Sequence, residues 1–266
     1  MKKFNDNVWV WGHPTNSMQS WFNRGVSTVS PVEGVSYMNA SCLMYNNLGD
    51  NKFDMNLESE LAKDLKKVGW CIDEGATNPP NITAICNKAK EYPNIKMGMF
   101  DDFFSLTNRE NNFINYTPQL MAAIREELHA AGLEMWVVLY TRDMRLVPME
   151  TIRSFLKEFD GVSLWFWDES EILNDYDKYV KIFMEETKNQ KRMMGCYVYN
   201  FGEGKPATVK AIIHQLEKAK EMMIKGNVEG LFIHTNPCFG LKDEPFEAVD
   251  ACQAWMREHG DDVISE

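Results

Sequence analysis

The chain has 266 residues, of which 44% are apolar and 25% are charged, a composition typical of a globular protein with one large core. Its 28 Lys and Arg against 39 Asp and Glu give a net charge of −11, so nucleic acid is not an expected partner. No apolar stretch has the length of a signal peptide or of a transmembrane helix. We therefore expect a cytoplasmic protein that has no membrane partner.

The sequence contains no pattern typical of a metal or cofactor site. Its six cysteines include no C-x-x-C pair, and neither an H-x-H nor an H-E-x-x-H motif occurs. We expect free thiols, no metal and no cofactor.

Eight short apolar or aromatic runs that end in polar residues recur along the chain, and each has the pattern of a buried strand. In chain order they cover residues 8–13, 35–42, 68–74, 95–102, 135–141, 162–169, 194–200 and 230–236. Amphipathic stretches lie between them, and the clearest predicted helices cover residues 118–131, 149–159, 176–188 and 209–224.

Strict alternation of strands and helices predicts parallel strands, and eight such units close a barrel. An open doubly wound sheet is the alternative, but the segment that follows the first strand at Gly12 lacks the G-x-G-x-x-G phosphate turn. The predicted fold class is therefore α/β, a (β/α)8 TIM barrel built as a single domain over residues 1–266. Strand-to-helix loops are longer than helix-to-strand links, so we expect the functional site at the carboxyl ends of the strands.

Two adjacent acids, Asp101 and Asp102, end the fourth predicted strand. Alternation along this strand predicts that Gly98, Phe100 and Asp102 face the barrel interior. Two close carboxylates do not both ionise easily, so one pKa rises and a general acid becomes available near neutral pH. Both residues are predicted to be catalytic. The alternative is that they cap the segment that follows.

The sixth predicted strand also ends in acids. Asp168 and Glu169 follow Trp167 there, and Glu169 is the third predicted catalytic residue. Asp168 is predicted to bind substrate, with capping of the next helix as the alternative, because acids favour the first helical turn.

Other strand ends carry aromatic rings and hydrogen-bonding groups, which together suit a sugar: a flat ring packs on its apolar face, and polar groups orient its hydroxyls. Core packing is the alternative for each of them. The predicted aromatic wall consists of Trp11, Tyr140, Trp167 and Tyr199, and the predicted polar groups are His13, His234, Asn39, Asn200 and Asn236.

The acid pair resembles that of barrel glycoside hydrolases of the O-GlcNAcase and bacterial hyaluronidase type, which carry consecutive aspartates at the end of the fourth strand. Tyr140, Trp167 and the segment Tyr199-Asn200-Phe201 are similar to residues that line the sugar pocket in that family. The resemblance implies that Asp101 orients a substrate acetamido group and that Asp102 is the acid/base. The loop after Asn200 departs from the family pattern, because it lacks the usual Pro and Asp.

The leading hypothesis is a glycoside hydrolase that acts on a small saccharide or glycoconjugate. The first alternative is a divalent-metal sugar isomerase or amidohydrolase with His13, Asp102, Glu169 and His234 as ligands, although the first strand offers one histidine where amidohydrolases need two. The second alternative is a barrel that binds saccharides without catalysis.

Overall fold

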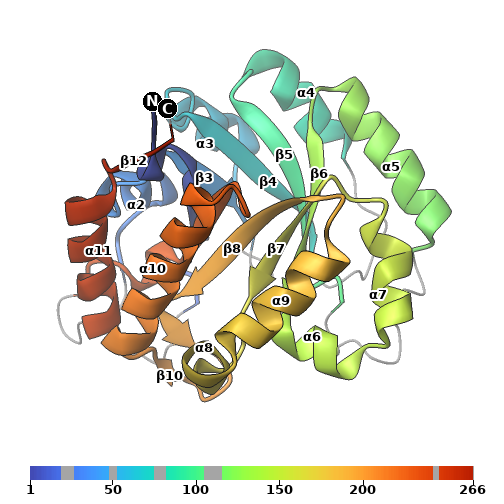
Figure 1. The fold of residues 1–266 in the computed structure, drawn as a ribbon. Coiled ribbons are helices and arrows are strands. Elements are labelled where there is room, and N and C mark those ends of the chain that lie inside the picture. Colours follow the sequence, from blue (N-terminus) through green and yellow to red (C-terminus); the bar gives the residue numbers. More distant parts are fainter. Residues whose placement is uncertain (19–26, 48–52, 75–81, 105–115, 242–245, 266) are drawn as a thin grey trace.

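The structure is a computed structural model that describes residues 1–18, 27–47, 53–74, 82–104, 116–241 and 246–265. Eight parallel strands form a closed barrel, in which each strand pairs with the next one along the chain and the last pairs with the first (Figure 1). The predicted (β/α)8 barrel is confirmed. Its strands are β2 (Val8–Gly12), β3 (Cys42–Tyr45), β4 (Lys67–Glu74), β5 (Ile95–Asp101), β6 (Glu134–Tyr140), β7 (Gly161–Trp165), β8 (Lys191–Tyr197) and β11 (Gly230–His234).

Helices surround the barrel and cover the outer face of its strands (Figure 1). Side-chain caps fix several of their starts: Thr117 accepts a hydrogen bond from the backbone N–H of Leu120 at 3.1 Å, and Thr208 accepts one from Ala211 at 3.2 Å. The helices are α2 (Pro31–Tyr37), α3 (Met55–Leu61), α4 (Thr83–Glu91), α5 (Pro118–Ala130), α6 (Thr141–Leu146), α7 (Met149–Leu156), α8 (Glu169–Asn174), α9 (Tyr176–Glu186), α10 (Val209–Ile224) and α11 (Glu247–His259).

Short elements complete the chain. The strand β1 (Lys2–Lys3) pairs antiparallel with β12 (Val263–Ser265), which brings the two ends of the chain side by side (Figure 1). The 3-10 turns η1 (Phe4–Asn7) and η3 (Asn236–Cys238) flank β2 and β11, and β9 (Tyr199–Asn200) pairs with β10 (Lys205–Pro206). Within the described ranges, no helix combines the length and the apolar character needed to span a bilayer.

The predicted second strand at residues 35–42 is wrong. Residues 35–37 belong to α2 and residue 42 is the first of β3. The helix starts with a capping box: Ser30 accepts from the N–H of Glu33, whose carboxylate accepts from the N–H of Ser30. The strand follows at β3, so Asn39 lies at its amino end, away from the expected site. There its side-chain amide donates to the carbonyl of Met256 at 3.1 Å. The prediction of Asn39 as a binding residue is therefore corrected.

Large aromatic and sulfur-containing side chains fill the barrel interior. Two tryptophan rings lie directly against backbone of the neighbouring strand: a Cβ added at Gly161 would lie 2.3 Å from Trp136, and one at Gly195 would lie 2.0 Å from Trp165. The absence of a side chain at each glycine therefore makes room for a tryptophan. The interior cluster consists of Trp9, Trp11, Cys42, Met44, Met97, Met99, Trp136, Val138, Tyr140, Trp165, Met193, Tyr197 and Phe232.

The predicted orientation of β5 is reversed. Met97 and Met99 face the interior, whereas Phe100 packs outside the barrel against Phe103 and Phe159. Both faces of this strand are apolar, so alternation alone could not distinguish inside from outside. The residue that continues the interior series is therefore Asp101 and not Asp102.

Candidate functional site

A pocket of about 80 Å³ opens at the carboxyl ends of the barrel strands. This is the face where TIM-barrel enzymes build their sites. A hollow of about 160 Å³ at the opposite end is lined by lysines and glutamates at or beside the strand starts, together with tryptophans and methionines, and its lining contains no aspartate pair. The pocket at the carboxyl ends is lined by His13, Met18, Asn46, Asp101, Asp102, Tyr140, Trp167, Tyr197, Phe201 and His234.

Asp101 is the last residue of β5 and is 9% exposed. One carboxylate oxygen accepts from the hydroxyl of Tyr140 at 3.1 Å and from the N–H of Asp102 at 2.9 Å. The other accepts from the side-chain amide of Asn46 at 2.8 Å. Three donors from three segments thus fix this carboxylate as a hydrogen-bond acceptor.

Asp102 reaches the same pocket by a different route. Its backbone adopts a left-handed conformation with φ of 49°, which ends the strand and turns the side chain toward the opening. The side chain is 32% exposed, and one carboxylate oxygen lies 3.5 Å from Nη2 of Arg142. Burial raises the pKa of Asp102, while Arg142 and the Tyr140 hydroxyl lower it to a smaller extent.

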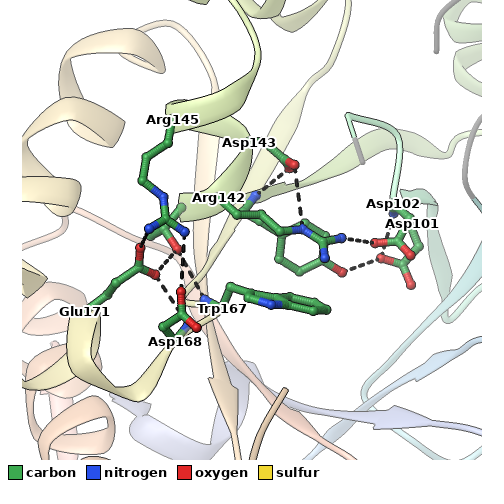
Figure 2. A network of polar contacts seen from close by, with 10 residues as sticks. Asp101, Asp102, Arg142, Asp143, Arg145, Trp167, Asp168 and Glu171 are labelled. Carbon is green, nitrogen blue, oxygen red and sulfur yellow. Dashed lines mark hydrogen bonds and ion pairs between the residues drawn. The ribbon is translucent and has the colours of Figure 1, made fainter. Parts of the chain in front are cut away.

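The guanidinium of Arg142 lies between aromatic rings (Figure 2). Its central carbon is 3.6 Å from the ring centroid of Trp167 and 4.9 Å from that of Tyr140. Stacking of this kind holds a guanidinium in place while its edges remain available to carboxylates. Together with Tyr197 and Phe201, Trp167 forms the aromatic part of the pocket wall.

Two histidines form another part of the pocket lining. Nε2 of His13 lies 3.3 Å from Nε2 of His234, and both side chains are buried. Burial lowers the pKa of His13 to about 4 and that of His234 well below its usual value, so both rings are neutral at pH 7. Asn236 fixes this arrangement, because its side chain accepts from the N–H of His13 at 2.8 Å and donates to the carbonyl of the same residue at 3.1 Å.

A second polar network ties α6 to α8 beside the pocket (Figure 2). Arg145 pairs with Glu171 at 3.1 Å and with Asp168 at 3.3 Å. Glu171 also accepts a hydrogen bond from Thr141 at 2.5 Å, and Thr141 accepts one from the N–H of Trp167 at 3.2 Å. This network fixes the position of Trp167 and holds Asp168 in a contact outside the pocket.

The structure brings six of the predicted site residues together in the pocket, namely His13, Asp101, Asp102, Tyr140, Trp167 and His234. Trp11 packs beneath them against Trp165 and Phe232, in the barrel core.

The other predicted residues lie outside the pocket lining, because the strands end earlier than expected. Glu169 belongs to α8 and accepts hydrogen bonds from the N–H and hydroxyl of Thr208, at 2.8 and 2.9 Å, which stabilises the start of α10. Tyr199 and Asn200 are buried in the separate strand β9, where Tyr199 packs against Phe246. Asn236, in η3, supports His13 from behind.

Sequence reasoning missed Asn46, Tyr197 and Met18 as pocket residues, and it named Phe201 only within the segment Tyr199-Asn200-Phe201. Asn46 follows the apolar run Cys42–Tyr45 directly, so the same strand-end pattern that identified the aspartates also marks it. Tyr197 ends β8 and faces the interior on the same side of the strand as Met193.

The residues of the metal alternative do not converge, because Glu169 is held by Thr208 while the two histidines and Asp102 line the pocket. Among the described residues, no group of three or more His, Cys, Asp or Glu side chains is arranged to hold a metal ion.

These features define a TIM barrel with a pair of adjacent aspartates and an aromatic wall at its carboxyl rim. No protein-family model matches the chain, and no curated protein matches its sequence. Solved structures are similar in fold. A family 17 β-1,3-glucanosyltransferase of Rhizomucor miehei has a TM-score of 0.52 at 10% identity, covering 87% of each chain.

Two further solved structures show that proteins of different function share this fold. A Group IV chitinase of Ostrinia furnacalis, solved with allosamidin, has a TM-score of 0.56 at 12% identity over 97% of this chain and 100% of its own. A tryptophan synthase of M. tuberculosis has a TM-score of 0.53 at 8% identity over 96% and 94%. Glycoside hydrolases are thus prominent among the neighbours, but the shared feature is the fold.

Proposed function

We propose that the protein is a glycoside hydrolase that acts on a saccharide or glycoconjugate, with Asp102 as general acid/base. The observation that carries the proposal is the contrast between two adjacent carboxyl groups in one pocket. Asp101 accepts three hydrogen bonds and is fixed, whereas Asp102 is partly open to the pocket and has a raised pKa. Two carboxyl groups in such different environments can take different roles, one as a proton donor and the other as a hydrogen-bond acceptor.

In the proposed reaction, Asp102 donates its proton to the glycosidic oxygen as the bond to the anomeric carbon breaks. Asp101 then acts as a preorganised acceptor that orients the substrate. The described part of the pocket lining offers no carboxylate other than this pair. This favours substrate-assisted cleavage, in which an acetamido oxygen of the sugar attacks the anomeric carbon.

The remaining pocket groups suit a neutral sugar. The rings of Trp167, Tyr197 and Phe201 supply apolar surface, and Asn46 and the neutral histidines supply hydrogen-bonding groups. Burial and the charge of Asp101 raise the pKa of the Tyr140 hydroxyl well above its usual value, so it remains a donor at neutral pH.

The test is turnover of aryl glycosides whose leaving groups differ in acidity, with and without a 2-acetamido group on the sugar. The Asp102→Asn variant should lose about 10²–10⁴-fold in rate on poor leaving groups and much less on activated ones, which depart without protonation. Glu169→Gln serves as a control, because Glu169 contacts Thr208 outside the pocket lining.

Equal losses of the Asp102→Asn variant on all leaving groups would show that Asp102 is not the acid. Binding of saccharides with no turnover of any glycoside would favour the non-catalytic alternative. Stoichiometric divalent metal in the purified protein would favour the metal-dependent one.

A further inference from the structure

Arg142 stands between two carboxyl groups, of which only one lines the pocket. On one side its Nη2 lies 3.5 Å from Asp102, and on the other its Nε lies 3.9 Å from Asp143 (Figure 2). Asp143 is fully buried behind the pocket, on α6. One guanidinium therefore serves two carboxyl groups, and its single charge can balance only one carboxylate.

We propose that Asp143 is a positioning residue that competes with Asp102 for Arg142 and so keeps the proton on Asp102. The inference rests on the proposed role of Asp102 as the acid. When Asp143 is ionised, it is the counterion of Arg142, and Asp102 stays protonated. Without that second carboxylate, Arg142 has Asp102 as its counterion, and Asp102 gives up its proton more easily.

The contacts of Asp143 suit this role. One carboxylate oxygen accepts from the N–H of Tyr140 at 3.0 Å, which anchors the group to the end of β6. The other has no hydrogen-bond partner among the described residues and faces Arg142. Burial raises the pKa of Asp143 to about 7; the Tyr140 N–H and Arg142 lower it, and the charge of Asp102 raises it further. The two carboxyl groups share one guanidinium, and their titrations are therefore coupled.

The other charged and titratable groups near this pair are few among the described residues. Asp101 at the end of β5 and the phenols of Tyr140 on β6 and Tyr197 on β8 face Asp102 and Arg142 from the pocket side. On α6 and α8, Arg145 is paired with Asp168 and Glu171 in the separate network described above. Asp143 is therefore the second carboxyl group that Arg142 contacts.

The first experiment is an NMR titration of labelled aspartate carboxyl carbons, in which the Asp102→Asn difference identifies the signal of Asp102. In Asp143→Asn, the apparent pKa of Asp102 should fall by about one unit or more, because an opposite charge within about 4–6 Å has effects of this size. Asp168→Asn is the matched control, since it removes a carboxylate of the same rim that pairs with Arg145. It should leave the titration of Asp102 unchanged.

Arg142→Gln provides a second test that does not depend on how well Asp143→Asn folds. Loss of the guanidinium should raise the apparent pKa of Asp102, and adding Asp143→Asn to it should then have little further effect on Asp102. An unchanged titration in Asp143→Asn with a shifted one in Arg142→Gln would overturn the role of Asp143.

The catalytic consequence is read from kcat/KM against pH. In Asp143→Asn the basic limb should move to lower pH, so that poor leaving groups are cleaved slowly at pH 7 and recover as the pH is lowered. Asp102→Asn should show no such recovery. If no glycoside is cleaved by the wild type, the proposed function fails, while the NMR titration still decides whether Asp143 controls the proton of Asp102.

Discussion

Trp167 illustrates how much one side chain contributes to the pocket. It lines the opening, carries the guanidinium of Arg142 on its ring, and packs against Tyr140 and Phe201. Its own backbone N–H is held by Thr141. The ring is therefore both a wall for a ligand and a support for the group that contacts Asp102.

Replacement of this ring should weaken substrate binding. We expect Trp167→Ala to raise KM by about tenfold, since loss of a ring contact and a cation–π pair is worth ~1–2 kcal/mol. Trp167→Phe should keep most of the affinity because it retains an aromatic face. Michaelis–Menten kinetics on one activated glycoside measure the effect, and equal KM values for the Ala variant and the wild type would contradict it.

At the scale of the element, the sequence predicted seven of the eight barrel strands close to their places. It also identified the aspartate pair, because acids that directly follow an apolar run are visible without any structure. The second strand failed because the apolar residues of α2 were assigned to it, although Ser30, Pro31 and Glu33 carry a helix-start signal. Asn39 was chosen in consequence, and Asn46 was missed.

Three features of the site could not be inferred from sequence. The inward face of β5 was ambiguous because both of its faces are apolar. Asp102 enters the pocket only because its backbone turns at positive φ. Among the residue types, only glycine is a reliable sequence signal for such a turn. The partnership of Arg142 with Asp102 joins β5 to α6 and follows only from the closed barrel.

The capping box of α2 supports a specific stability prediction. Ser30→Ala removes the hydroxyl that accepts from the N–H of Glu33, and it should lower the free energy of unfolding by about 1 kcal/mol. Ser36→Ala is the matched control, because Ser36 is an exposed residue inside the same helix. Urea denaturation of both variants measures the difference, and similar losses in the two would exclude a capping role.

At the scale of the whole molecule, buried titratable groups make stability depend on pH in two opposite directions. Burial lowers the pKa of His13 to about 4 in the folded protein, against 6.5 in the unfolded chain. Its contribution to the free energy of unfolding is therefore complete above pH 6.5 and is lost as the pH falls toward 4. Burial raises the pKa of Asp143 to about 7 in the folded protein, against 3.8 in the unfolded chain. Its contribution to the free energy of unfolding is therefore complete below pH 3.8 and is lost as the pH rises toward 7.

The pH dependence of unfolding separates these two contributions. Between pH 7.5 and 4.5 the wild type should lose roughly 2–3 kcal/mol more than His13→Gln, given about 1.4 kcal/mol per pKa unit. Asp143→Asn should gain stability over the wild type progressively as the pH rises from about 3.8 to about 7, and the gain should stay constant above that. Urea titrations across this pH range provide the measurement, and parallel curves for the wild type and His13→Gln would rule out His13 as a source of acid sensitivity.

The glycines beneath Trp136 and Trp165 also shape how the sequence can change over evolution. Because each ring occupies the volume that a Cβ would need at Gly161 or Gly195, neither member of a pair can vary freely while the other stays. Among related sequences, side-chain size should covary at positions 136 and 161, and likewise at positions 165 and 195. Where the tryptophan is replaced by a smaller residue, the glycine should be replaced by alanine or a larger residue.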